Sequence, residues 1–192
     1  DTIQGGKGDD VLDGAAGADI FVFEATGADN GADVFSVSGV NKLVAGAGGD
    51  VLNFKNFLSG GSVDQNGGAG TAITAYAANA TNDVNITNKV VLLADQTGTA
   101  TTAVDQASEI AALIQGSGDV FSLTAGGKAI IVAGDTASDA GSATSELLYI
   151  YYVDDTLDGI SGTVNTPDVV LVGTTTQDFD LDTLITSNFA FS

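Results

Sequence analysis

The sequence reads Gly5-Gly6-Lys7-Gly8-Asp9-Asp10-Val11-Leu12-Asp13 and continues at once with Gly14-Ala15-Ala16-Gly17-Ala18-Asp19-Ile20-Phe21-Val22. Both stretches share one nine-residue spacing, with small residues first, an aspartate sixth and a large apolar residue eighth. Asp1 and Ile3 fit the same frame. Glycine permits the positive φ angles of tight turns, and one apolar side chain per short strand provides an interior. The spacing therefore predicts a coil of short strands joined by tight turns.

Carboxylates at this spacing favour a bound cation. Neighbouring strands lie about 4.8 Å apart, so stacked turns can share one ion. Calcium accepts six to eight oxygen ligands in flexible geometry, whereas magnesium requires a tighter octahedron. The Gly-Gly-x-Gly-x-Asp-x-apolar-x pattern resembles the calcium-binding nonapeptide repeat of the RTX family. That resemblance implies two nonapeptides per coil, with Asp1 and Asp19 on one edge and Asp10 on the other.

The same resemblance implies a set of Ca²⁺ ligands. Side-chain oxygens would come from Asp1, Asp10 and Asp19. Main-chain carbonyls would come from the two turns 5–9 and 14–18, at Gly5, Lys7, Asp9, Gly14, Ala16 and Ala18. Solvated turn residues are the alternative reading of these aspartates. Two consecutive repeats with a third in phase favour calcium over that alternative.

The repeat frame is lost after Val22. A further repeat requires aspartate at position 28, which is Ala28, and Asp29 comes one residue late. We therefore expect at most one or two coils, sealed by a strand at 20–23. The segment 29–58 is similar to the region that follows the repeats in serralysin-type and other type I secreted proteins. That similarity implies Asp33 and Asp50 as further calcium ligands, with plain loop carboxylates as the alternative.

Composition narrows the function. The chain has 22 Asp and 3 Glu against 5 Lys, which gives a formal charge of −20. Such a charge disfavours nucleic acid and anionic membranes as partners and is normally relieved by bound cations. His, Cys and Arg are absent, so the usual catalytic bases, thiol nucleophiles and anion clamps are missing. We predict a protein that is not an enzyme and does not insert into membranes.

The remaining sequence predicts a mainly β fold: a short calcium-binding parallel β-roll, then a β-sandwich or continued β-solenoid with one α-helix at about 103–115. The helix has an apolar stripe and a capping-box-like pair, Thr102 and Asp105. The aromatic run 147–153 predicts a central strand covered on both faces, or a strand whose Tyr face meets a partner. The expected segments are 1–58, 59–94 and 95–192. Strands are expected at 89–94, 119–124, 128–133, 146–153, 168–173 and 178–185.

The C-terminal part carries a second resemblance. The run 134–173 is similar to the C-terminal region of RTX surface proteins and S-layer proteins, and Asn188-Phe189-Ala190-Phe191-Ser192 resembles an uncleaved type I secretion signal. The chain starts within a repeat and without Met, which indicates the C-terminal piece of a longer protein. Acidic clusters near 154–158 and 178–182 are further sites that calcium could occupy, and the sequence leaves them open.

Together these features predict an extracellular or cell-surface protein, secreted without an N-terminal signal peptide. One hypothesis is a calcium-dependent folding and assembly domain of a structural protein such as an S-layer, filament or adhesin. Its partners would be calcium, copies of itself in an oligomer or lattice, and possible cell-surface polysaccharide. The alternative is the export and folding module of a secreted protease, lipase or haemolysin whose active domain lies upstream.

Overall fold

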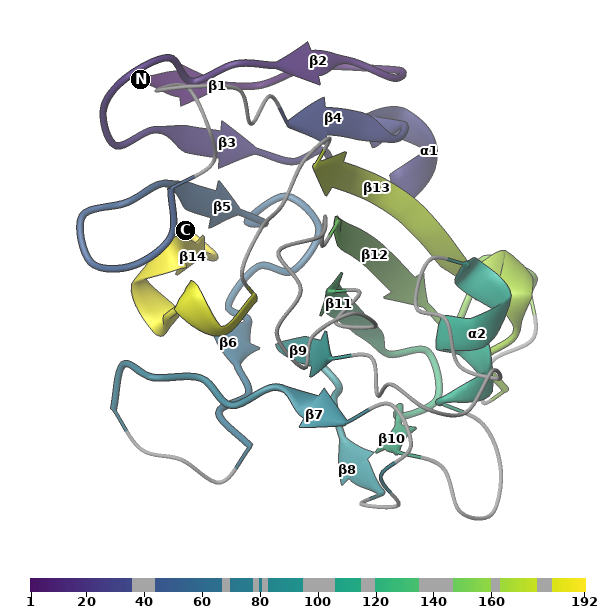
Figure 1. Cartoon of the computed structure of the whole chain (residues 1–192). Coiled ribbons are helices and arrows are strands. Elements are labelled where there is room, and N and C mark those ends of the chain that lie inside the picture. Colours follow the sequence, from purple (N-terminus) through teal and green to yellow (C-terminus); the bar gives the residue numbers. More distant parts are fainter. Residues whose placement is uncertain are drawn as a thin grey trace.

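Strands dominate the chain, as the composition predicts (Figure 1). The computed structural model describes residues 1–35, 44–66, 70–77, 80, 83–94, 106–114, 120–134, 147–159, 163–175 and 181–192. Within these ranges the strands form several sheets, none of them closed, with two α-helices, α1 (Gly27–Asn30) and α2 (Ala107–Ala112).

The first five strands alternate between two sheets, and residues 1–54 are called the coil region below. In chain order they are β1 (Thr2–Ile3), β2 (Val11–Leu12), β3 (Ile20–Val22), β4 (Asp33–Phe35) and β5 (Val51–Asn53). Strands β1, β3 and β5 pair in parallel in a four-stranded sheet, while β2 and β4 pair in parallel in an eight-stranded sheet. The chain thus crosses from one sheet to the other after every strand (Figure 1).

Register in the coil region follows the nonapeptide spacing. The apolar residue at the eighth position points inward: Ile3 aligns with Phe21 and Phe21 with Leu52, while Leu12 aligns with Phe35. The residue before it is β-branched in every strand, a side chain that suits a pleated surface. These residues are Thr2, Val11, Ile20, Val34 and Val51.

The coil continues past the break in the repeat. The expectation that the strand at 20–23 seals the coil is wrong, because β3 is flanked by β5 as well as β1. Helix α1 lies in the longer turn between β3 and β4, and this turn takes up the extra residues. Asp33 therefore stands beside Asp10 in the register, in the place where the strict spacing put Ala28.

Long strands form the centre of the eight-stranded sheet. They are β9 (Lys89–Ala94), β11 (Lys128–Gly134), β12 (Leu148–Asp154) and β13 (Val169–Thr175). Strand β12 pairs antiparallel with β11 and β13, β11 pairs in parallel with β9, and β13 pairs in parallel with β4 of the coil region. The sheet ends at β6 (Ser62–Val63), and β7 (Tyr76–Ala77) also pairs with β9. A separate pair joins β8 (Val84–Asn85) to β10 (Phe121–Ser122).

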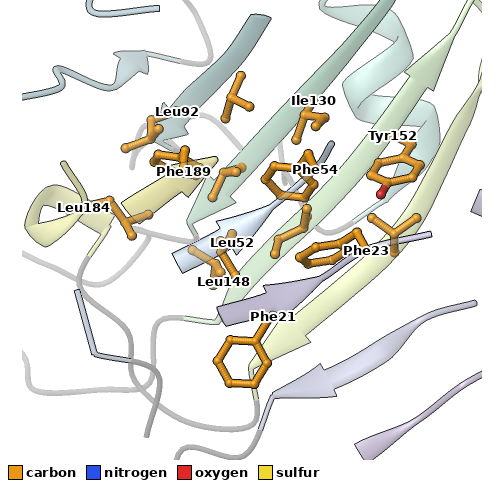
Figure 2. Packing of buried hydrophobic residues seen from close by; sticks show 14 of the residues in the cluster. Phe21, Phe23, Leu52, Phe54, Leu92, Ile130, Leu148, Tyr152, Leu184 and Phe189 are labelled. Atoms are coloured by element: carbon orange, nitrogen blue, oxygen red, sulfur yellow. The ribbon is translucent and has the colours of Figure 1, made fainter. Parts of the chain in front are cut away.

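Both faces of the central sheet are buried, as the aromatic run predicts. One cluster lies between this sheet and the coil region and joins Phe23, Phe54 and Tyr152 with Phe189 of the C-terminal strand β14 (Phe189–Ala190) (Figure 2). The other face packs Tyr151 and its neighbours against α2. Tyr151 and Tyr152 are 0% and 1% exposed, so β12 is a central strand covered on both sides. The eight-stranded sheet takes strands from each of the segments 1–58, 59–94 and 95–192.

Two local predictions need correction. The helix expected at about 103–115 is described as Ala107–Ala112 and begins after Gln106 without a side-chain cap; Thr102, Asp105 and the rest of its expected N-terminus lie outside the described residues. The strand expected at 178–185 is wrong for Leu181–Thr183, which forms a 3₁₀ turn. Asp178 and Asp180 lie outside the described residues. Within the described ranges no helix is long and apolar enough to cross a membrane.

Candidate metal centre

Five aspartates, four just before a strand of the coil region and Asp33 as the first residue of β4, stand in two rows. Strand pairing places Asp1, Asp19 and Asp50 in a row along one edge, where the turns 13–18 and 44–50 lie. Asp10 and Asp33 form a second row along the opposite edge. The two edges are the ones that the sequence assigned to Asp1, Asp19 and Asp10, and the rows also collect Asp33 and Asp50.

Each row is linked by hydrogen bonds from main chain to side chain. The Asp10 N–H donates to Asp33 Oδ1 at 3.1 Å, and the Asp19 N–H donates to Asp50 Oδ1 at 2.8 Å. The main-chain nitrogen of Asp1 donates to Asp19 Oδ1 in the same manner. Asp19, Asp33 and Asp50 thus each cap the backbone at the start of the preceding strand in their sheet, and the rows have a direction along the coil.

The first glycine of each repeat makes room for its own aspartate. A Cβ on Gly5 would lie 2.8 Å from Asp10 Oδ2, and a Cβ on Gly14 would lie 2.6 Å from Asp19 Oδ2. These separations are shorter than real side chains tolerate, so only glycine fits at the first position. The repeat therefore folds each carboxylate back over the start of its own turn. The turn carbonyls expected as ligands come from the same short stretches of chain.

The carboxylates differ in how many oxygens the protein already uses. Both oxygens of Asp50 accept N–H groups, from Asp19 and, at 2.7 Å, from Val44. Both oxygens of Asp33 are also engaged, the second by the Asn30 side-chain amide at 3.1 Å. By contrast, Asp10 Oδ2 is buried and has no hydrogen-bond partner among the described residues. Asp10 and Asp19, the aspartates of the two complete nonapeptides, thus each direct one carboxylate oxygen toward the glycine that begins their own repeat.

Charge accumulates in the shorter row. Asp33 is 3% exposed, and this burial raises its pKa to about 6. The negative charges of Asp10 and Asp9 raise the pKa further, whereas hydrogen bonds from the Asp10 N–H and the Asn30 amide lower it. Two adjacent carboxylates in a desolvated place repel each other unless a proton or a cation intervenes. A divalent cation would relieve this repulsion.

The remaining predicted ligands lie around the turns. Asp1 lies at the end of its row and is exposed. The turn residues Ala16 and Ala18 are exposed as well. Asp9 Oδ1 accepts the Ala32 N–H at 2.8 Å. The Lys7 ammonium pairs with Asp29 on the next turn, which raises the pKa of Lys7 and lowers that of Asp29 mainly through this hydrogen bond. This pair ties the 4–9 turn to α1.

The acidic turn after β12 is built differently. Asp154 binds Lys128 across the strand pair at 3.0 Å, and Asp155 Oδ2 accepts the Gly126 N–H at 2.7 Å. Asp168 accepts main-chain N–H groups of Asp158 and Asn165. These carboxylates hold turns together by hydrogen bonds to the protein. Within the described ranges, no three Asp or Glu side chains gather closely enough to hold a metal ion by themselves.

Sequence reasoning missed two buried asparagines, one at the end of each row. Asn30 and Asn188 are both 1% exposed. Asn30 donates to Asp33 Oδ2 and to the Val172 carbonyl, while Asn188 donates to the Asp50 carbonyl at 2.8 Å. Their partners are up to 142 positions away in the sequence, so local spacing carries no signal for them.

Comparison with known families agrees with this geometry. Residues 1–25 match the RTX calcium-binding nonapeptide repeat (4 copies). The matched residues contain β1, β2, β3 and both complete turns. Comparisons with curated proteins and with solved structures give no match.

Calcium is therefore the cation of this repeat, since nonapeptide repeats of this family bind Ca²⁺. The residues present fit that ion. They offer only oxygen donors, as calcium prefers, and they include a buried carboxylate oxygen without a partner at Asp10. Such repeats are a structural element typical of secreted proteins, and they carry no catalytic group of their own.

Proposed function

We propose that this chain is a calcium-folded β-roll domain of an extracellular structural protein exported by type I secretion. The observation that carries the proposal is the pair of aspartate rows. Five carboxylates, four of them buried or half-buried, are stacked on two edges of one coil, and the part that forms the full repeats matches the RTX nonapeptide family.

The proposed calcium ligands are the carboxylate oxygens that no N–H group of the protein already occupies. Asp10 and Asp19 would hold calcium through the oxygens that face Gly5 and Gly14, together with carbonyls of the turns 5–9 and 14–18. Asp33 and Asp50 would instead position the backbone, because N–H donors already occupy both of their oxygens. Calcium supplies positive charge between carboxylates that otherwise repel each other. Lys7, Asp9, Ala16, Ala18 and Asp1 belong to the same proposed set as carbonyl or edge ligands.

Calcium binding would then control folding. Extracellular calcium modules bind with dissociation constants of about 10⁻⁴–10⁻³ M, and each site filled at ten times its dissociation constant adds about 1.4 kcal/mol to stability. In low calcium the coil region of this chain of charge −20 would stay expanded, which keeps the chain open enough for export, and the tail 188–192 would serve as the secretion signal. Outside the cell, calcium would fold the coil region.

The structural role is favoured because the coil region and the C-terminal strands share one apolar core. Leu12 and Phe35 of the coil pack in the same cluster as Ile130 and Leu148. The C-terminal half is thus part of one large body.

Sedimentation velocity in chelator and in millimolar calcium tests the proposal. Calcium should convert a monomer whose coil region is expanded into a compact species that associates as concentration rises. Compaction without association would support the alternative, an export and folding module for an active domain elsewhere. No change in sedimentation on adding calcium would contradict calcium-dependent folding. Asp19→Asn should weaken the calcium response, whereas Asp83→Asn, at an exposed loop position, should leave it unchanged.

A further inference from the structure

Asn30 and Gly31 form an Asn-Gly pair at the point where helix α1 ends. In a flexible chain such a pair is chemically unstable, because glycine has no side chain to obstruct the main-chain nitrogen that follows the asparagine. The Gly31 nitrogen attacks the side-chain carbonyl carbon of Asn30, ammonia leaves, and a succinimide ring forms. Water then opens the ring at either carbonyl and leaves aspartate or isoaspartate.

The fold requires glycine at the second position of this pair. Gly31 has a φ of 73°, which glycine adopts without strain. A Cβ at this position would lie 2.4 Å from the carbonyl carbon of Gly8 on the neighbouring turn. Any other residue would therefore push the two turns apart.

The fold also requires an amide at the first position. Asn30 is 1% exposed. Its Oδ1 accepts the Glu24 N–H at 2.9 Å, and its Nδ2 donates to the Val172 carbonyl at 2.9 Å and to Asp33 Oδ2 at 3.1 Å. Only a side chain that both accepts and donates can make these bonds. Asn30 thereby fastens the coil region to β13, and the labile pair is a consequence of this geometry.

The folded chain blocks the reaction at both reacting groups. The Gly31 N–H donates to the Gly27 carbonyl at 3.0 Å, so its nitrogen is not free to attack. The Asn30 amide is held on the opposite side by Glu24 and Val172, and its burial excludes the water that would open the ring. The coil region must open locally before the two groups can meet.

Neither product fits the folded structure. Aspartate at this position would place a carboxylate, which only accepts hydrogen bonds, against the Val172 carbonyl and the Asp33 carboxylate. Two buried carboxylates in contact repel each other. Isoaspartate would instead add a methylene group to the main chain just before β4, where Asp33 is in register with Gly173 of β13.

We propose that Asn30-Gly31 is a conditional modification site, protected from deamidation in the folded chain and deamidated in the unfolded chain. Loss of the amide removes the link between the coil region and β13, and it is irreversible because ammonia leaves. The pair therefore limits how long an unfolded chain stays able to fold. This inference requires no calcium and goes beyond the proposed function.

Incubation of the full chain in mildly basic buffer, with and without concentrated urea, tests the site by peptide mapping in the mass spectrometer. In urea, Asn30 should convert at a rate similar to that of Asn66, which also precedes a glycine. In the folded chain Asn30 should convert at least about a hundredfold more slowly than in urea, because the reaction needs local opening. Equal rates of Asn30 conversion in the two conditions would overturn the proposal, as would an Asn30 that stays intact in urea while Asn66 converts.

Refolding from urea tests the consequence. After increasing times in urea the chain is returned to folding buffer with calcium, and compact and expanded fractions are separated by size. Chains converted at Asn30 should be depleted from the compact fraction about tenfold or more, because a buried partner is left unsatisfied. Chains converted only at Asn66 should refold fully. Equal recovery of both modified forms would show that the modification does not control folding.

Two variants separate this chemistry from packing. Asn30→Gln keeps an amide but cyclises far more slowly, so its refolding yield should not decline with time in urea, whatever its starting value. A decline as fast as that of the unaltered chain would assign the loss to another lesion and overturn the proposal. Asn66→Asp is the matched control for the change of charge and should refold like the unaltered chain. Sorting of modified chains does not depend on either variant.

This test is independent of the calcium proposal, because urea sets the folded and unfolded states. A sedimentation coefficient that ignores calcium would contradict the proposed function, and the protection of Asn30 in the folded chain would still stand.

Discussion

The strands of the coil region and the central strands are held together by different physical means. Coil strands are two or three residues long and are held by aspartate–backbone bonds and glycine turns. The central strands β9, β11, β12 and β13 are six or seven residues long, and apolar side chains cover both of their faces. The first construction places charges next to one another, and we propose that a cation relieves their repulsion, whereas the second derives its stability from burial. Calcium should therefore control one region far more than the other.

The largest expected effect comes from a substitution that destabilises the central strands and does not involve calcium. Ile131 on β11 is 0% exposed and belongs to the cluster on the α2 side of the sheet, away from the coil region. Ile131→Ala should lower the free energy of unfolding by about 4 kcal/mol through the cavity it leaves. Urea unfolding should give nearly the same loss in calcium and in chelator. A loss confined to the calcium-bound protein would contradict the division between the regions.

A pH titration of the calcium-free chain sharpens the electrostatic side of the comparison. The pKa of Asp33 is raised to about 6 by burial, so folding favours its protonated form. This contribution to stability is present in full below the unfolded pKa near 4 and is lost as pH rises through 6. The contribution of Asp33 to the calcium-free stability should therefore rise by about 2 kcal/mol from pH 7 to pH 4.5. Asp33→Asn should remove that portion of the pH dependence, and Asp83→Asn should retain it.

Adding one methyl group to a turn of the coil region should affect calcium-dependent stability specifically. In Gly14→Ala the new Cβ would collide with Asp19 Oδ2, so calcium-bound stability should fall by about 2 kcal/mol and the calcium midpoint should rise. Ala15→Gly is the adjacent control with the opposite sign, because Ala15 has φ of 59°, which glycine adopts more easily. Calorimetry with calcium titration measures both. Equal changes in stability and calcium midpoint for the two variants would contradict close packing of the Asp19 carboxylate against Gly14.

The smallest effects concern lysines. Lys7→Ala removes an exposed pair with Asp29 and should leave the melting temperature within error, since exposed ion pairs contribute little. Lys128→Ala removes a bond to Asp154 and a contact 4.6 Å above the Phe57 ring, and it should cost about 1 kcal/mol. Thermal melts in calcium compare the two. A larger loss for Lys7 would mean that the 4–9 turn depends on its tie to α1.

Local spacing was enough to predict the first part of the fold. The inward positions of Ile3, Leu12 and Phe21 and the opposite edges of Asp10 and Asp19 follow from a nine-residue period that alternates between two sheets. The strand at 89–94 has the predicted bounds. A run this short, rich in β-branched residues and bounded by polar residues, favours a strand over a helix.

Contacts between distant segments were not predictable in this way. Asp33 returns to the row because α1 absorbs the extra residues, and a fixed period cannot represent an insertion. The docking of β14 depends on Asn188 meeting Gly46 and Asp50, which lie 142 and 138 positions away. At Leu181–Thr183, alternation of polar and apolar residues suggested a strand where a 3₁₀ turn forms. Periodicity describes local exposure, and it does not identify which strand a segment will join.

The most direct test of the central claim is hydrogen–deuterium exchange, resolved by region, across a calcium titration. Protection of 1–35 and 44–54 should rise together with calcium, while β11 and β12 should be protected at much lower calcium. If both regions gain protection at one midpoint, the chain folds as a single calcium-dependent unit. In that case the proposed contrast between a cation-dependent coil and a burial-stabilised sheet would be wrong.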